Sequence, residues 1–317
     1  MWMILLTGAT GFVGRAVLSQ LTSKPHSDIR TFGRSSSFSL ELNEVYGLEH
    51  LQGDINGTSD YTSALCGVDI VIHSAALAHV MHSNNKNCDS YRDINFHGAV
   101  NLAKQSINAG VKRFVFISSI AVNGSFTNFQ PFTIDSSANP ESDFSKSKYD
   151  AETEIINIAA DSGLEVVIVR PTLVYGSNAP GNFGILTKLI TKTPLLPFGL
   201  TNNKRDFIAV QNLADLLITC AKHPNAGGHT FLASDGETVS IKDFTNAIAK
   251  GLNKKLIQLP VPVSLMFLAA RIVGKKAMAE QLLGNLQVDS SNAQEVLGWV
   301  PPFTMEQAMA SLSENKK

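Results

Sequence analysis

Three glycines near the start of the chain have a spacing suited to phosphate chemistry. The apolar run Trp2 to Leu6 leads directly into Thr7-Gly8-Ala9-Thr10-Gly11-Phe12-Val13-Gly14, and a helical pattern of apolar residues follows. A buried strand that turns into a helix through glycines lets bare backbone approach a pyrophosphate. The negative charge then lies against free N–H groups and the positive end of the helix dipole. The segment predicts a dinucleotide site built from Gly8, Thr10, Gly11, Phe12, Val13 and Gly14.

The bulk composition suits a globular enzyme. The chain has 317 residues, of which 44% are hydrophobic, enough for one large domain and an appended lobe. Its net charge is −1, and Lys and Arg never occur more than two in a row, which argues against nucleic acid as a partner. The three cysteines, Cys66, Cys88 and Cys220, match no metal or disulfide spacing. They indicate reduced thiols and a cytoplasmic protein, and the N-terminus lacks the basic region of a signal peptide.

Strand-like and helix-like runs alternate over the first half of the chain. Candidate strands are 2–6, 29–32, 69–73, 113–118 and 165–170, with amphipathic stretches such as 98–108 and 148–160 between them. This alternation predicts an α/β fold with a doubly wound parallel sheet, Rossmann-like, and a smaller discontinuous α+β lobe for substrate. We expect residues 1–172 and about 206–231 to form the dinucleotide-binding domain, with a strand at 205–210 returning to the sheet. Residues of about 173–205 and 232–317 would form the lobe.

Several further motifs carry a family resemblance. Gly53-Asp54-Ile55, His73-Ser74-Ala75-Ala76 and Asn95 follow one another in the order and spacing of the extended short-chain dehydrogenases/reductases. The chain resembles their nucleotide-sugar epimerase, dehydratase and 4-ketoreductase group from about residue 2 to 312. The resemblance implies that Asp54 accepts a hydrogen bond from the adenine amino group beside Ile55. It also implies that Ala75 and Ala76 pass over the cofactor and that Asn95 ties neighbouring strands together.

The residues after the second strand indicate which dinucleotide binds. An acidic side chain there would hold both ribose hydroxyls of NAD and repel a 2′-phosphate, but this chain has Arg34-Ser35-Ser36. Arg34 and the serines suit NADP(H), which is favoured, although a solvated Arg34 with NAD(H) stays open.

The catalytic segment departs from the family pattern Tyr-x-x-Ser-Lys-x-x-Ala-Glu. Here the chain reads Phe144-Ser145-Lys146-Ser147-Lys148-Tyr149-Asp150-Ala151-Glu152, which places Lys148 on the family's lysine and Phe144 on its tyrosine. Tyr149 cannot substitute, because it lies about 100° round the helix from Lys148. The resemblance makes Ser119 the catalytic Ser/Thr and replaces the usual Tyr-Gly by Asn123-Gly124. Either another acid supplies the proton, or Phe144 is a deliberate Tyr-to-Phe change; we favour the second.

The resemblance also implies a nucleotide-sugar site. Pro171 and Tyr175 lie in a segment similar to Arg-Pro-x-x-Val-Tyr-Gly, which leads from the last cofactor strand into the sugar pocket. Asn182 and Arg205 match residues that meet the diphosphate, where an arginine can form two parallel hydrogen bonds, although Arg205 could also be a strand-edge charge. The C-terminal 286–291 and 297–301 segments most resemble bacterial 4-ketoreductases and 4-epimerases of the UDP-N-acetylquinovosamine type.

These observations predict an NAD(P)-dependent oxidoreductase that acts at C4 of a UDP-sugar, through reduction of a 4-keto-6-deoxy-HexNAc. Ser119 would polarise the oxygen, and Lys148 would hold the nicotinamide ribose. In the family, that lysine lowers the tyrosine pKa, so Phe144 is expected to impair this chain. The alternatives are a UDP-sugar 4-epimerase and a non-catalytic NADP-sensing protein, and a homodimer stays open. Lys148, Ser119 and Arg205 argue against the sensor.

One apolar stretch remains outside this scheme. Residues 261–273 are apolar apart from Ser264 and Arg271, and Lys254-Lys255 and Lys275-Lys276 flank them. The stretch is too short to span a bilayer. A surface helix that dips into a membrane fits the pattern, but a lid or a buried helix of the lobe is favoured, so membrane contact is not expected. None of the eight histidines has metal-ligand spacing, and no metal is expected.

Overall fold

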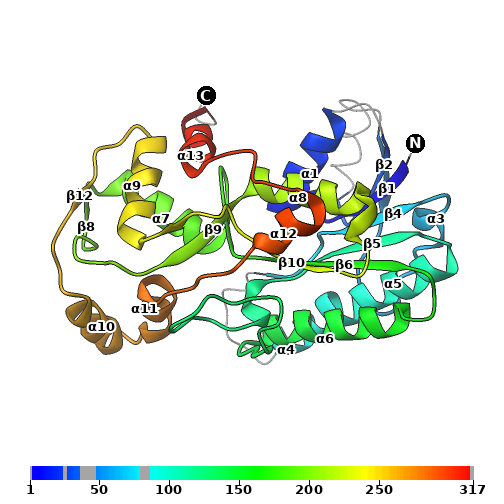
Figure 1. Cartoon of the computed structure of the whole chain (residues 1–317), viewed down its shortest axis with the longest axis horizontal. Helices are drawn as coiled ribbons and strands as arrows, with labels where there is room; N and C mark the ends of the chain where they lie inside the picture. The colour runs from blue at the N-terminus through cyan, green and yellow to red at the C-terminus, as the bar shows by residue number, and fades with distance from the viewer. Residues whose placement is uncertain (1, 24–26, 36–47, 79–85, 315–317) are drawn as a thin grey trace.

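The central sheet is parallel and carries helices on both faces. The structure, a computed structural model, describes residues 2–23, 27–35, 48–78 and 86–314 (Figure 1). Seven strands lie in the order β10-β6-β5-β4-β1-β2-β3, and every neighbouring pair is parallel. Their bounds are β1 Trp2–Thr7, β2 Ser27–Gly33, β3 Glu49–Gln52, β4 Ile70–His73, β5 Arg113–Ile117, β6 Glu165–Pro171 and β10 Thr230–Ala233. The expected doubly wound parallel sheet is confirmed.

Alternating side chains of the strands build two cores. Ile4 and Leu6 of β1 pack on one face with helices α1 (Phe12–Thr22) and α8 (Val210–Lys222). Leu5 packs on the other face with α3 (Thr62–Leu65), α5 (Ala99–Asn108) and α6 (Asp143–Ala159). Because both faces are covered, the central strands β1, β4, β5 and β6 are largely apolar, as in other buried parallel sheets. Figure 1 shows α1 and α8 on one side of the sheet and α5 and α6 on the other.

A smaller set of elements lies beside this layer. A three-stranded sheet has the order β11-β9-β7, and a two-stranded sheet pairs β12 with β8. The strands are β7 Leu173–Tyr175, β8 Leu195–Leu196, β9 Arg205–Ala209, β11 Thr238–Val239 and β12 Ile257–Gln258. The helices are α7 Gly181–Lys192, α9 Ile241–Gly251, α10 Val263–Ile272, α11 Lys276–Leu283 and α13 Met305–Glu314, whereas α12 Ser291–Leu297 packs into the core of the main sheet. A third hydrophobic cluster, which includes Phe183, Phe207 and Phe244, forms the core of this part.

One expectation about the sheet needs correction. The strand at 205–209 does not return to the main sheet, because β9 pairs with β7 and β11 instead. The seventh strand is β10, which pairs with β6. β3 and β10 have only four residues each, which is too short for a clear pattern of alternation. The helix after residue 205 does return, since α8 packs into the same core cluster as α1.

Candidate functional site

The glycine loop is folded so tightly that side chains would not fit in it. Gly8 has φ +73°, and a Cβ on it would lie 2.6 Å from the backbone nitrogen of Ala75. A Cβ on Gly14 would lie 2.1 Å from the carbonyl oxygen of Gly8, and the Gly11 N–H donates to that oxygen at 2.9 Å. Helix α1 follows with Gly11 as its N-cap and no side-chain cap, so its first N–H groups are open to an anion. This cradle fits the diphosphate of a dinucleotide.

The other residues expected at the dinucleotide lie at the carboxyl ends of the neighbouring strands. Arg34 follows β2 and Asp54 follows β3, and the Gly53 N–H donates to the Gly33 carbonyl at 3.0 Å, which joins the two ends. Arg34, Asp54, Ala76 and Thr10 are exposed, Ile55, Phe12 and Val13 are half-buried, and Pro171 is buried. Ser36 lies outside the described residues. In open α/β sheets, ligands bind along this edge of the sheet.

Asn95 ties together different elements from those expected. It is buried in the π-helical turn η1 (Arg92–Gly98). Its amide exchanges two hydrogen bonds with the backbone of Leu77, at 2.8 and 3.0 Å, and donates to Ser147 Oγ at 3.1 Å. Asn95 therefore joins the segment after β4 to helix α6, rather than one strand to another.

Lys148 lies buried beneath the carboxyl ends of the strands. A capping box of Ser142 and Ser145 starts α6 at Asp143, five residues before Lys148, so Phe144 and Lys148 lie one turn apart. Lys148 Nζ lies 4.0 Å from the ring centroid of Phe116, and the residue is 1% exposed. Burial lowers the pKa of Lys148 to about 7, and the charge of Glu152 opposes this shift.

Phe144 and Ser119 lie at the two positions where the family has a hydroxyl. Phe144 is half-buried in the first turn of α6, and its ring lies edge-on to Tyr91 of α4 (Lys86–Tyr91), with centroids 6.1 Å apart. Ser119 caps the short helix η2 (Ile120–Val122), and its Oγ accepts from the Ala121 N–H at 3.2 Å. Because that lone pair is used, the Ser119 proton can be donated to an oxygen of a ligand.

A buried ion pair behind Lys148 was not expected from the sequence. Arg170 of β6 donates to both carboxylate oxygens of Glu152, at 2.5 to 3.2 Å, and its Nη1 donates to Asn123 Oδ1 at 3.0 Å. Asn123, which replaces the family's tyrosine, therefore bonds to the arginine that neutralises Glu152. The spacing of Lys148 and Glu152 on one helical face was a signal in the sequence, but Arg170, the partner of Glu152, comes from strand β6.

A second buried group is His73, whose motif was visible in the sequence but to which no role was assigned. Its Nδ1 lies 2.8 Å from Thr7 Oγ1, and its ring stacks on Phe116 with centroids 5.8 Å apart. Its Nε2 has no hydrogen-bond partner among the described residues. Burial, assisted by the charge of Lys148, lowers the pKa of His73 to about 3, so the ring is neutral at physiological pH. The hydrogen bond between Thr7 and His73 joins the ends of β1 and β4. Gly8 and Ala75, which follow these strands closely, pack against each other there.

Arg205 lies at the start of β9, next to a segment from the C-terminal part of the chain. Its Nη1 donates to the Gly284 carbonyl at the end of α11 at 2.9 Å, and burial lowers its pKa to about 10. Leu286 exchanges backbone hydrogen bonds with Lys204 and Asp206. Leu286 also belongs to the small apolar cluster that contains Ile120, the residue after Ser119. The 286–288 segment thus connects the loop of Ser119 with the strand of Arg205.

Tyr175 and Asn182 differ in accessibility. Tyr175 is fully buried, and its hydroxyl donates to Asp235 at 2.7 Å. Asp235 also accepts from the Ala209 N–H and from the side chain of Asn212, so this network joins β7, β9 and the start of α8. Asn182 is exposed in the first turn of α7. Of the two, only Asn182 presents a polar group to a ligand in this conformation.

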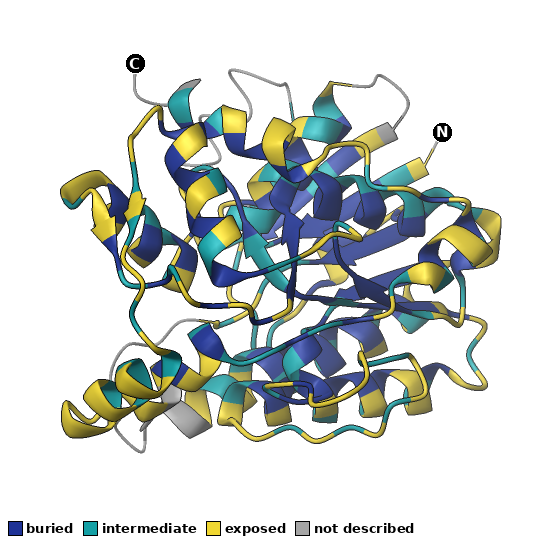
Figure 2. Cartoon of the chain, turned by 60° about the vertical axis from the view of Figure 1, so that its left-hand side comes forward, coloured by how far each residue is buried: buried dark blue, intermediate teal, exposed yellow. Residues whose placement is uncertain are grey.

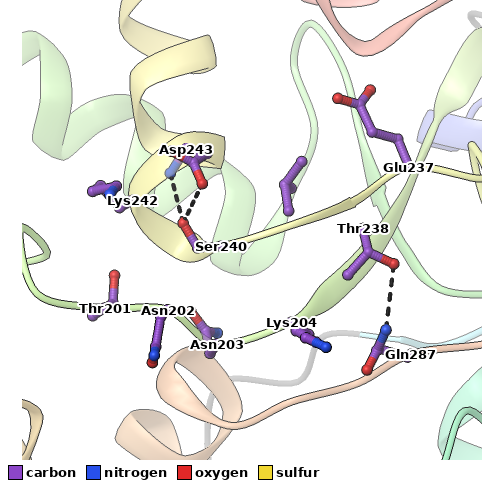
Figure 3. Close-up of a pocket in the computed structure, with 11 residues that line it drawn as sticks. Thr201, Asn202, Asn203, Lys204, Glu237, Thr238, Ser240, Lys242, Asp243 and Gln287 are labelled. Carbon is purple, nitrogen blue, oxygen red and sulfur yellow. Dashed lines mark hydrogen bonds between the residues drawn. The ribbon is translucent and has the colours of Figure 1, made fainter.

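A polar cavity of about 650 Å³ lies beside the start of β9 (Figure 3). Lys204 and Lys242 line it together with Glu237 and Asp243, and Gln287 donates weakly to Thr238 across one wall at 3.5 Å. Asp243 is occupied as part of the cap of α9, where it accepts from Ser240 Oγ at 2.6 Å. Ser119, Phe144 and Lys148 do not line this cavity.

Comparison with known proteins decides the family. A model of the NAD dependent epimerase/dehydratase family matches residues 4–237. A UDP-glucose 4-epimerase of Vibrio cholerae is 42% identical over 314 residues, which is 98% of this chain and 94% of that protein. The chain belongs to the NAD-dependent epimerase/dehydratase family. The resemblance to extended short-chain dehydrogenases/reductases is therefore confirmed, while the likeness to quinovosamine enzymes stays a prediction.

Solved structures of the epimerase/dehydratase type share the fold. A UDP-glucose 4-epimerase of Thermotoga maritima, solved with UDP-glucose, has a TM-score of 0.78 at 21% identity and covers 98% of this chain and 97% of that one. A UDP-glucuronic acid 4-epimerase of Bacillus cereus, solved with NAD, has a TM-score of 0.78 at 18% identity and covers 99% and 100%. The family is NAD-dependent, and the preference for NADP(H) expected from Arg34 finds no support in these comparisons.

Proposed function

We propose that this chain is a 4-epimerase of a UDP-hexose, the reaction that the sequence left as the alternative to 4-keto reduction. The observation that carries the proposal is the 42% identity to a UDP-glucose 4-epimerase along almost the whole of both chains. The buried Lys148, the hydroxyl of Ser119 and the buried Arg205 support it, since an enzyme of this class needs a ribose clamp, a donor at O4 and a diphosphate anchor.

The two parts of the molecule divide the binding between them in this proposal. Residues 1–172 and about 210–233 hold the dinucleotide, and residues of about 173–209 and most of 234–317 hold the UDP-sugar; the expected boundaries of 206 and 231 shift because β9 pairs with β7 and β11 and the whole of β10 pairs with β6. Gly8, Gly11 and Gly14 and the open end of α1 would bind the cofactor diphosphate, with Asp54 near the adenine and Lys148 at the nicotinamide ribose. The bound nicotinamide would supply the hydride chemistry at C4. We propose NAD(H) as the resident cofactor, and Arg34 as a side chain that also tolerates NADP(H).

Side chains of the protein donate and accept the proton at the O4 oxygen of the sugar. Ser119 Oγ accepts a hydrogen bond from the Ala121 N–H, and its hydroxyl proton would be donated to the sugar oxygen. Lys148 has a pKa of about 7, which lets it hold or release a proton near neutral pH. Arg170 neutralises Glu152 and Asn123 holds Arg170, so these three residues position α6 and set the field at Lys148.

Phe144 limits the rate in this scheme. A phenol at this position, one helical turn before Lys148, would exchange the proton of O4 directly. The phenyl ring keeps the shape of the site and removes that proton, so exchange depends on Ser119 and Lys148. General acid/base help from one placed group is typically about 10²- to 10⁴-fold, and we propose that the chain lacks roughly this factor.

The substrate diphosphate lies against Arg205 and Asn182 in this proposal. The guanidinium is held by one hydrogen bond to Gly284, which leaves further N–H donors for phosphate oxygens. Tyr175 acts as a positioning residue, because its hydroxyl is bound to Asp235 and its ring is buried in the core.

The experiment compares epimerisation with reduction. The chain is incubated with UDP-galactose and NAD(H), and the UDP-sugars are resolved by chromatography. Appearance of UDP-glucose without net consumption of reduced dinucleotide supports the epimerase. A stoichiometric loss of NADPH with a UDP-4-keto-6-deoxy-HexNAc, and no interconversion of hexoses, would support the 4-ketoreductase instead.

A further inference from the structure

Helix α10 has apolar residues on both of its faces. Val263, Met266, Phe267 and Ala270 pack against the core of the smaller part of the molecule. Leu265, Leu268 and Ile272 lie on the opposite face, at spacings of three and four residues, and are 54%, 54% and 76% exposed. The helix contains no buried residue, so of the two expected forms, a lid or a buried helix of the lobe, the buried helix is wrong, while the lid stays a prediction. A helix on the surface of a globular protein normally has a polar outer face.

The exposed apolar face continues past the end of the helix. Val273 is 66% exposed, and Met278 of α11 is 46% exposed. Together with Leu265, Leu268 and Ile272 they form what we call the α10 patch. In Figure 1 α10 lies at the lower left edge of the molecule with α11 on its inner side, and Figure 2 shows many exposed residues in this region. A contiguous group of exposed apolar side chains such as this one is typical of a surface that binds a protein, a ligand or a membrane.

The charges around the α10 patch select its partner. Residues 254–280 contain five basic side chains, Lys254, Lys255, Arg271, Lys275 and Lys276, and one acidic one, Glu280, which lies 3.3 Å from Lys276, although the whole chain has a net charge of −1. All five are exposed. An apolar helix face with basic residues beside it is the pattern of helices that lie in the interface of an anionic membrane.

We propose that the α10 patch docks this enzyme on the surface of an anionic lipid bilayer. Leu265, Leu268 and Ile272 enter the boundary between headgroups and acyl chains, and Arg271, Lys275 and Lys276 contact the anionic headgroups. The contact is with the membrane surface, because no helix among the described residues is long and apolar enough to cross a bilayer. This proposal is independent of the reaction that the site catalyses.

The test measures flotation of the full chain with vesicles. We expect the chain to float with vesicles of phosphatidylcholine and phosphatidylglycerol, and at least tenfold less with phosphatidylcholine alone. The double variant Leu268→Glu, Ile272→Glu should lose at least tenfold in partitioning. Lys275→Glu, Lys276→Glu should lose about tenfold or more, since each cation near an anionic surface strengthens binding by about fivefold.

Matched variants elsewhere control for general effects. Ile156→Glu changes an isoleucine of α6 that is 48% exposed, and Lys188→Glu, Lys192→Glu changes two exposed lysines of α7. All three changes should leave flotation as it is. Failure of the unmodified chain to float, or equal loss in the controls, would overturn the proposal.

Analytical ultracentrifugation without lipid tests the competing partner, a second copy of this chain. If the Leu268→Glu, Ile272→Glu variant changes from dimer to monomer while vesicle binding of the unmodified chain is absent, the patch is an interface between copies and the membrane proposal is wrong.

Discussion

Replacing Lys148 by methionine separates two effects of the buried ammonium group. One is its effect on the stability of the fold, and the other is its effect on the affinity for the dinucleotide. The pKa of Lys148 is about 7 in the folded chain, compared with 10.5 for an ordinary lysine. Below pH 7 the side chain is charged in both states and the folded state bears the full cost of burial. Between pH 7 and 10.5 the unfolded chain binds more protons, so stability rises with pH in this window.

The size of the effect follows from this difference in pKa. At about 1.4 kcal/mol for each tenfold change in proton affinity, the shift sets an upper limit of roughly 5 kcal/mol. The variant also loses the contact between Nζ and the Phe116 ring, which offsets part of this increase in the free energy of unfolding. We therefore expect Lys148→Met to stabilise the fold by about 1–3 kcal/mol at pH 6. Near pH 10 the gain should vanish, while dinucleotide affinity falls at both pH values.

Urea unfolding at pH 6 and pH 10 measures this prediction, with Lys146→Met as the control. Lys146 is exposed on the same helix, so its replacement should change the free energy of unfolding by less than about 0.5 kcal/mol at either pH. If Lys148→Met is less stable than the unmodified chain at pH 6, or changes stability equally at both pH values, the ammonium is not buried as described.

Four other substitutions test the remaining assignments. Phe144→Tyr should raise kcat by about 10²- to 10⁴-fold with little change in dinucleotide affinity, and a kcat within threefold of the unmodified chain would remove Phe144 from the proton path. Arg205→Ala should weaken UDP binding by roughly ten- to a hundredfold in calorimetry, and unchanged affinity would refute the diphosphate assignment. Arg34→Ala should weaken NADPH binding by about three- to tenfold in fluorescence titration and leave NADH binding unchanged; equal losses would contradict a role at the 2′-phosphate. Glu152→Ala should destabilise the fold by about 3 kcal/mol in urea unfolding, because it leaves Arg170 buried without its partner, and a loss under 1 kcal/mol would mean that Arg170 finds another one.

The sequence predicts the dinucleotide half of the fold because its signals are local. The glycine loop, the apolar runs of β1, β4, β5 and β6, and the helical spacing of Phe144 and Lys148 are all visible within a few residues of each other. The strand at 205–209 looked equally regular, but its sheet partners β7 and β11 depend on contacts that no local pattern contains. Its assignment to the main sheet was therefore wrong.

The contacts that shape the candidate site are mostly long-range. Arg170 meets Glu152 and Asn123 from three different elements, and Arg205 meets Gly284 at the end of a distant helix. Residue types alone indicate that such groups are charged or polar, but the partner of each comes from the fold. For helix α10 the apolar residues were visible in the sequence. Only the structure shows that no part of the described chain covers its outer face.

The central claim is that this chain interconverts the C4 epimers of a UDP-hexose, and one NMR measurement tests it most directly. UDP-galactose labelled with deuterium at C4 is incubated with NAD(H) and either the unmodified chain or the Phe144→Tyr variant, and the product is followed by its anomeric proton. The account predicts UDP-glucose that retains the deuterium at C4, because hydride leaves and returns at the same carbon inside the site. Absence of UDP-glucose, together with NADPH consumption by a UDP-4-keto-sugar, would contradict it.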